Sequence, residues 1–111
     1  MVAALPPLRH LGIKHMQFLT VSRRLTEAFP ESEFAARAAA EMEQARALFA
    51  QGCLRQIWLR GDVPGACILW EADSEEQVRE LLGRLPLFRA GMLEVTILAL
   101  KPYAGFCPAK T

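Results

Sequence analysis

Alternation of hydrophobic and polar residues predicts four β-strands in this chain of 111 residues. The segments are residues 14–22, 54–60, 66–72 and 92–100. In each of them side chains of similar character recur at every second position, which is the period of a strand. A turn rich in Gly and Pro, residues 61–65, separates the second and third segments and predicts a β-hairpin.

Two further segments have the composition and spacing of α-helices. Residues 31–51 are rich in Ala, Glu, Arg and Met, and Gly52 is a suitable residue for ending the helix. The hydrophobic residues close to one face of this helix are Phe34, Ala38, Met42, Ala45 and Phe49. Residues 73–84 start with Asp73 or Ser74 as the N-cap. The second helix is expected to bury Val78, Leu81 and Leu82.

The resulting order β-α-β-β-α-β predicts an α+β, ferredoxin-like subunit. Its four-stranded antiparallel sheet has both helices on one face, and the other face is bare in a monomer. A bare apolar face is usually buried against a partner, so we expect a homo-oligomer of the dimeric α/β-barrel type. The expected domain is residues 14–102, with an N-terminal arm at 1–13 and a C-terminal tail at 103–111.

Composition narrows the class of protein. A hydrophobic fraction of 52% supports a folded core, and a formal net charge of +1 argues against a dedicated nucleic-acid binder. No apolar run approaches the roughly 18 residues of a membrane span. Three cysteines without a CxxC motif favour reduced thiols in a cytoplasmic protein. We expect no metal site, because the only histidines, His10 and His15, lack the spacing of a helical metal pair.

The strand alternation also predicts which side chains face away from the helices. Leu93, Val95 and Ile97 suit the helix side, as do Cys67 and Leu69. The bare face would then carry His15, Gln17, Gln56, Trp58, Arg60, Ile68, Trp70, Glu94 and Thr96. Two indoles beside a histidine, a carboxylate and a guanidinium are typical of a small-molecule pocket. We therefore expect a pocket that contains Glu94, Trp58 and at least one of His15 and Arg60.

Each of these residues also has a purely structural explanation. Trp58 and Trp70 could belong to a dimer interface, and His15 could be a hydrogen-bonded structural residue. Glu94 is the more informative position, because a carboxylate within an apolar strand is costly without a partner or a function. Arg55 or Arg60 could neutralise it.

The second half of the chain resembles the muconolactone delta-isomerase family over roughly residues 50–102. The resemblance rests on the sequence Leu85-Pro86-Leu87-Phe88, followed by Glu94-Val95-Thr96, then Leu98 and Pro102. Upstream it includes Gln51-Gly52, Arg55 and Trp58.

The resemblance implies a subunit that pairs sheet to sheet and isomerises a small unsaturated lactone of aromatic-compound catabolism without a cofactor. A proton leaves a ring carbon, a dienolate forms, and the proton returns two carbons away. The candidates are Glu94 or His15 for proton transfer and Arg55 or Arg60 for the substrate carboxylate, with Trp58, Gln56 and Trp70 as further substrate contacts. Two alternatives are another small-molecule enzyme on the same barrel, such as a cofactor-independent monooxygenase, and a non-catalytic ligand-binding or assembly module.

Overall fold

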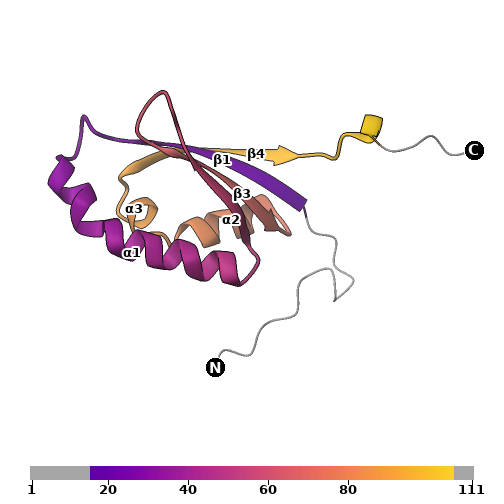
Figure 1. The fold of residues 1–111 in the computed structure, drawn as a ribbon, viewed down its shortest axis with the longest axis horizontal. Coiled ribbons are helices and arrows are strands. Elements are labelled where there is room, and N and C mark those ends of the chain that lie inside the picture. Colours follow the sequence, from indigo (N-terminus) through magenta and orange to yellow (C-terminus); the bar gives the residue numbers. More distant parts are fainter. Residues whose placement is uncertain (1–15, 107–111) are drawn as a thin grey trace, which may run out of the picture.

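The computed structural model describes residues 16–106, which fold into one four-stranded antiparallel sheet with helices against one of its faces (Figure 1). The elements in chain order are β1 (Met16–Arg24), α1 (Glu31–Ala50), β2 (Leu54–Leu59), β3 (Ala66–Ala72), α2 (Glu75–Leu82), α3 (Pro86–Arg89), β4 (Leu93–Leu100) and the 3₁₀ turn η2 (Ala104–Phe106). The strand order is β2-β3-β1-β4, so both neighbours of β1, one of the two central strands, are distant from it in sequence.

The small α+β domain with its antiparallel sheet is confirmed, with shifts at the ends of elements. β1 extends to Arg24, two residues beyond its predicted end. The short helix α3 was not predicted. It begins with a proline in its first turn, where the missing N–H costs nothing. The predicted arm at 1–13 lies outside the described residues, and the predicted tail at 103–111 is described only as far as Phe106.

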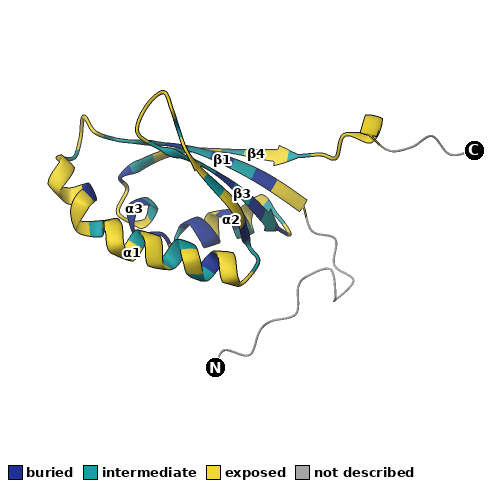
Figure 2. Ribbon diagram, viewed as in Figure 1, coloured by how far each residue is buried: buried dark blue, intermediate teal, exposed yellow. Residues whose placement is uncertain are grey.

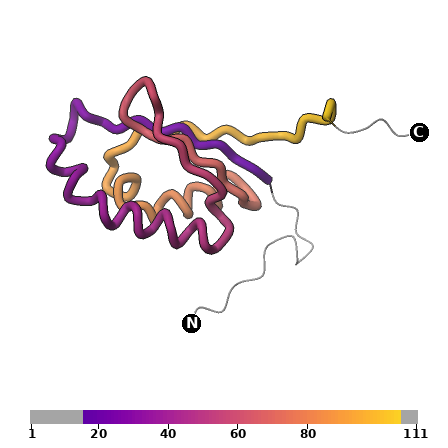
Figure 3. The backbone as a smooth tube through the Cα atoms, viewed as in Figure 1, coloured from indigo at the N-terminus to yellow at the C-terminus, as the bar shows by residue number. Residues whose placement is uncertain are grey.

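The core lies between the sheet and the helices (Figure 2). Its fully buried residues include Phe18 from β1, Trp70 from β3 and Val78 from α2. The Ser74 side chain accepts a hydrogen bond of 3.1 Å from the backbone N of Gln77, which confirms Ser74 as the N-cap of α2. The tube in Figure 3 shows the helical segments on one side of the strands and β4 continuing away from them. Within residues 16–106 we find no helix that is both long and apolar enough to cross a membrane.

The buried face of α1 differs from the prediction. Phe34 and Leu48 are buried, whereas Met42 and Phe49 are exposed. The 20-residue helix carries hydrophobic residues on two sides, and its mixed Ala, Glu and Arg composition does not show which side meets the sheet. The expectation that Met42 and Phe49 face the core is therefore wrong.

The predicted orientation of β3 is also wrong. Ile68 and Trp70 point into the core, and Trp70 is 0% exposed. Trp70 pairs with Phe18 on β1 and with Leu54 on β2, both of which are buried. Cys67, Leu69 and Glu71 occupy the opposite face. Both faces of β3 are largely apolar, so Glu71 was the one polar residue that could have indicated the orientation.

Candidate functional site

The face of the sheet opposite the helices is defined by the positions that alternate with the buried residues of β1. Gln17, Leu19, Val21 and Arg23 of β1 lie on this open sheet face, between cross-strand partners on both sides. The partners are Glu71, Leu69 and Cys67 on β3, and Leu100, Leu98, Thr96 and Glu94 on β4. The outward orientation of Gln17, Glu94 and Thr96 agrees with the prediction.

β2 adds three of the predicted residues to the same face. Gln56 and Trp58 pair with Leu69 and Cys67, and Trp58 is 50% exposed. A register shift between Leu54 and Gln56 interrupts the alternation, and Arg55 and Gln56 are consequently both exposed. Strict alternation would have turned Arg55 toward the helices.

The centre of the open sheet face is apolar. Leu19, Val21, Cys67 and Leu69 are half-buried there, and Leu98 is exposed. We call these five residues the apolar band. Its polar neighbours gather at the two ends of the strands, which gives the face two separate polar clusters.

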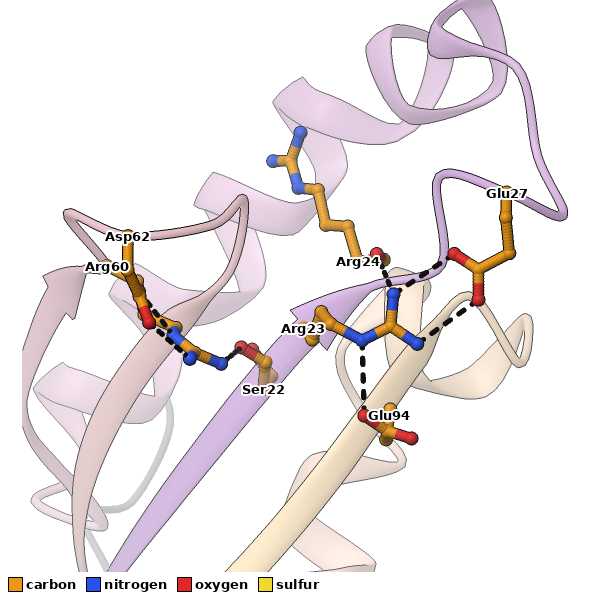
Figure 4. Close-up of polar contacts among 7 residues, drawn as sticks. All are labelled: Ser22, Arg23, Arg24, Glu27, Arg60, Asp62 and Glu94. Carbon is orange, nitrogen blue, oxygen red and sulfur yellow. Dashed lines mark hydrogen bonds and ion pairs between the residues drawn. The ribbon is translucent and has the colours of Figure 1, made fainter.

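At one end, Arg23 holds two carboxylates. Its Nε lies 3.2 Å from Oε1 of Glu94, and its two terminal nitrogens lie 3.0 and 3.1 Å from the oxygens of Glu27 (Figure 4). Hydrogen bonds from Arg23 lower the pKa of Glu27, and both carboxylates raise the pKa of Arg23. The Glu94 side chain is 66% exposed. Glu94 thus has an arginine partner, but that partner is Arg23 rather than Arg55 or Arg60.

Arg60 lies near the same end of β1 as Arg23, on the side of the β2–β3 hairpin. Its guanidinium donates three hydrogen bonds. It donates two hydrogen bonds, of 2.9 and 2.7 Å, to the Asp62 carboxylate and a third, of 3.2 Å, to the carbonyl of Ser22 (Figure 4). The bonds from Arg60 and the backbone N of Val63 lower the pKa of Asp62 to about 2. Arg60 therefore ties the β2–β3 hairpin to the end of β1.

At the opposite end, Glu71 lies beside a depression of about 460 Å³. The lining residues are Met16, Gln17, Glu71, Leu100, Lys101 and Pro102. The Glu71 side chain is only 19% exposed, and its Oε2 lies 3.9 Å from Nε of Arg55. The depression thus combines a largely buried carboxylate, an amide and the cationic side chain of Lys101 with apolar walls, and Arg55 lies next to the carboxylate.

Gln17, which the sequence pattern placed on the bare face, lies in one cluster with Glu71 and Lys101, which the pattern did not indicate. Gln17 faces Glu71 across β1 and β3. The available signal was the position of Glu71 in phase with the outward residues of β3. This signal was missed because the sequence pattern was interpreted with Cys67 and Leu69 of β3 facing the helices.

The two clusters are far apart within one chain. Gln17 pairs with Leu100, whereas Arg23 pairs with Glu94. Arg23 lies six positions after Gln17 along β1, which corresponds to about 20 Å. Glu94, Arg60 and Trp58 are associated with the Arg23 half of the face, and Trp70 is absent from it because it is in the core. His15 lies outside the described residues.

Two cysteines, Cys53 and Cys67, lie among the described residues, and both are free thiols. Partial burial raises the pKa of Cys53. Among residues 16–106 no group of three or more His, Cys, Asp or Glu side chains is arranged to hold a metal ion.

Comparison with known proteins places this fold in a family. The profile of the muconolactone delta-isomerase family matches residues 16–104. A solved muconolactone isomerase is similar with a TM-score of 0.70 and 20% sequence identity, over 86% of this chain and 98% of that one. A 5-chloro-2-hydroxyhydroquinone dehydrochlorinase from Burkholderia phenoliruptrix AC1100, solved with 2,5-dihydroxybenzoquinone, is similar with a TM-score of 0.64 and 19% identity, over 81% of this chain and 98% of that one. No curated protein matches the sequence.

Proposed function

Because this chain belongs to the muconolactone delta-isomerase family, we propose that it is an isomerase that moves a proton along a small unsaturated lactone without a cofactor. The observation that carries the proposal is the family match over residues 16–104, which spans every strand of the open sheet face. The two solved structures support the fold, at 20% and 19% sequence identity.

The depression beside Glu71 is the proposed reaction site. General acid–base catalysis requires a group that reaches the substrate while sheltered from bulk water. Glu71 meets this requirement better than Glu94, because its side chain is 19% exposed and that of Glu94 is 66% exposed. Arg55 and Lys101 flank Glu71 from β2 and from the end of β4.

In the proposed reaction the Glu71 carboxylate removes a proton from a ring carbon of the lactone. The electrons of that C–H bond move into the conjugated system and form a dienolate. The carboxylic acid then returns the proton two carbons away, which regenerates the carboxylate. Lys101 supplies positive charge for the enolate oxygen, and Arg55 binds the substrate carboxylate.

The remaining residues predicted from the sequence take subordinate places in this proposal. His15 directly precedes Met16, a lining residue, and is the second candidate for proton transfer. Gln56 and Trp58 would contact the substrate from β2. Glu94 and Arg60 hold the far end of the face through Arg23 and Asp62.

The experiment is a direct assay with muconolactone, followed by the absorbance change of the conjugated lactone, on wild-type protein and two matched variants. We expect Glu71→Gln to lower kcat by about 10²-fold or more, the usual contribution of a general acid–base group. Glu94→Gln, which also removes one carboxylate from the open sheet face, should stay within a few-fold of wild type. A large loss of kcat in Glu94→Gln but not in Glu71→Gln would assign proton transfer to Glu94. Full activity in both variants would make His15 the next candidate.

The dehydrochlorinase suggests one other reaction to include in the assay. That protein has 19% identity to this chain and was solved with a dihydroxybenzoquinone. Loss of chloride from a chlorinated hydroquinone also begins with removal of a proton, which the same carboxylate could perform. Release of chloride from 5-chloro-2-hydroxyhydroquinone, with no turnover of muconolactone, would favour this second function.

We also propose that the chain works in the cytoplasm as a ferredoxin-like homo-oligomer, at least a dimer, joined through the open sheet face. Trp58 and the apolar band would otherwise leave a contiguous apolar surface in water. Light scattering at micromolar concentration should give at least twice the mass of the 12.4 kDa chain. A monomer under these conditions would contradict this arrangement.

A further inference from the structure

β2 contains one residue more than its partner strand β3 beside the proposed reaction site. Leu54 pairs with Trp70 of β3. Two positions later Gln56 pairs with Leu69, which is only one position from Trp70. Arg55 is therefore the extra residue of a β-bulge. Leu54 is buried, whereas Arg55 and Gln56 are both exposed. The bulge thus turns Arg55 to the open sheet face.

The N–H group of Ile57, two residues after Arg55, lies on the free edge of the sheet. β2 is the first strand in the order β2-β3-β1-β4 and has a neighbour on one side only. The backbone N of Arg60 donates a 3.0 Å hydrogen bond to the carbonyl of Gly65 across the hairpin. Hydrogen-bonded pairs alternate along an antiparallel ladder. Ile57, three positions before Arg60, therefore directs its N–H away from β3.

The side chain of Gln56 satisfies this N–H group. Its Oε1 accepts a hydrogen bond of 2.9 Å from the backbone N of Ile57. The residue that directly follows Arg55 thus uses its amide oxygen on its own strand. This bond fixes the backbone on the C-terminal side of the bulge.

The backbone on the N-terminal side of the bulge is fixed by Glu71. Its backbone N donates a 2.8 Å hydrogen bond to the carbonyl of Cys53, two residues before Arg55. A Cβ atom at Gly52 would lie 4.0 Å from Nη1 of Arg55, so the guanidinium lies close to the turn between α1 and β2. With its backbone held on both sides, Arg55 places its Nε 3.9 Å from Oε2 of Glu71.

The guanidinium of Arg55 differs from those of Arg23 and Arg60 in the use of its donors. Arg23 and Arg60 donate hydrogen bonds to carboxylates. The contact of Arg55 with Glu71 is an ion pair whose atoms are too far apart for a hydrogen bond. Arg55 makes no hydrogen bond to any residue between 16 and 106. Its fork of N–H groups can therefore bind a ligand carboxylate through two bonds.

We propose that Gln56 is a positioning residue, which closes the bulge and thereby presents Arg55 to the substrate carboxylate. The inference rests on the proposed function, in which Arg55 binds that carboxylate, and it adds a residue that acts through Arg55. Loss of the Gln56 oxygen should weaken substrate binding and leave the proton-transfer group Glu71 in place. In the assay with muconolactone, KM should therefore rise while kcat changes less than 2-fold.

The first measurement is a double-mutant cycle on ligand binding by isothermal titration calorimetry. The probe is the saturated analogue of muconolactone, which carries the carboxylate and cannot form a dienolate. Gln56→Met removes the acceptor oxygen at similar length, and Arg55→Gln removes the guanidinium. We expect Gln56→Met to raise Kd by about 3- to 10-fold, the equivalent of one hydrogen bond, and by less than about 2-fold once Arg55 is replaced.

Gln77→Met is the matched control for the cycle. The Gln77 side chain makes the same kind of contact, a 2.7 Å hydrogen bond from the backbone N of Asp73 to its Oε1, at the start of α2. Its loss should leave the Kd of the analogue unchanged. A Kd that rises equally in Gln77→Met and Gln56→Met would overturn the assigned link between Gln56 and Arg55.

The second measurement needs no ligand. By NMR, we expect Gln56→Met to accelerate amide hydrogen exchange at Ile57 by about 3- to 10-fold. It should also lower the heteronuclear NOE of the Arg55 Nε–H group, because the side chain becomes more mobile. Gln56→Glu keeps an acceptor oxygen and should restore both values. An unchanged NOE of Arg55 in Gln56→Met overturns the inference.

The outcomes separate this inference from the proposed function. If the effects of Gln56→Met and Arg55→Gln on Kd simply multiply, Gln56 acts by its own contact with the ligand. The inference is then overturned and the isomerase proposal stands. If wild type neither binds the analogue nor turns over muconolactone, the proposed function is overturned. The NOE of Arg55 alone then decides whether Gln56 positions the guanidinium.

Discussion

The indole Nε1 of Trp70 donates a hydrogen bond of 2.9 Å to Oγ1 of Thr20, across strands β3 and β1 in the interior of the protein. Trp70 is 0% exposed and Thr20 is 2% exposed, so neither polar atom has access to bulk water. The bond allows a large aromatic side chain to occupy the core without leaving its N–H unsatisfied. It also explains why Trp70 cannot contribute to the open sheet face.

We expect Thr20→Val to lower the free energy of unfolding by about 1–3 kcal/mol, because it leaves the buried indole N–H without an acceptor. Thr20→Ser is the control. It keeps the hydroxyl and should cost only about 1 kcal/mol for the lost methyl group. Urea denaturation measures both. Equal stability losses in the two variants would show that the hydrogen bond is not the source of the effect.

Gly65 is required where the β2–β3 hairpin crosses the end of β1. A Cβ atom at this position would lie 2.0 Å from the backbone oxygen of Ser22, while the backbone N of Arg24 donates a 2.9 Å hydrogen bond to the carbonyl of Pro64. Gly65→Ala should therefore destabilise the protein by about 1–3 kcal/mol, the usual cost of overpacking.

Gly61 provides the matched comparison, because a Cβ there would meet nothing within 4 Å. Thermal melts of both alanine variants should show a lower Tm for Gly65→Ala alone. A similar loss at both positions would indicate a general requirement for flexibility in the hairpin rather than the close approach to Ser22.

Glu41 of α1 is expected to make stability depend on pH. Its Oε1 accepts a 2.9 Å hydrogen bond from the backbone N of Leu87 in α3. Burial raises the pKa of Glu41, partly offset by this bond and by Arg24 and Arg89. A raised pKa in the folded state means that the contribution of Glu41 is greatest below the unfolded pKa, near 4.3, and is lost as the pH rises through the folded value.

Glu41→Gln keeps the acceptor and removes the charge. Its free energy of unfolding relative to wild type should therefore increase between about pH 4 and pH 7. The exposed neighbour Glu43 provides the control Glu43→Gln, for which no such trend is expected. If the free energy of unfolding of Glu41→Gln relative to wild type does not change over this pH range, burial does not raise the pKa of Glu41.

The Asp62 carboxyl should titrate with a pKa of about 2 in the folded protein. The main cause is the two-bond contact with Arg60. A depressed pKa contributes stability that is present above the unfolded value, near 3.9, and is lost as the pH falls toward 2. Carbon-13 NMR of the carboxyl measures the midpoint directly. Arg60→Gln should move it upward, and an unchanged midpoint would remove Arg60 as the cause.

Much of the fold was determined by local sequence patterns. The strand segments, the Ser74 cap and the Gly- and Pro-rich turn can be recognised from residues close in sequence, and they indicated the strands, α2 and the hairpin. The β4 pattern was sufficient to assign Glu94 and Thr96 to the open sheet face, because its first inward positions are aliphatic and these two polar residues alternate with them. The family resemblance likewise rested on residues within one continuous half of the chain.

Only the tertiary structure decided the orientation of β3, the buried side of α1 and the grouping of the charged residues. In β3 and α1 hydrophobic residues occupy both sides, so the side that is buried depends on the partners across the sheet and not on local periodicity. The bulge at Arg55 and the pairing of Arg23 with Glu94 depend on strand register, which joins residues far apart in sequence. For the same physical reason alternation could place Gln17 and Glu94 on one face, but only the register shows that they lie at its opposite ends.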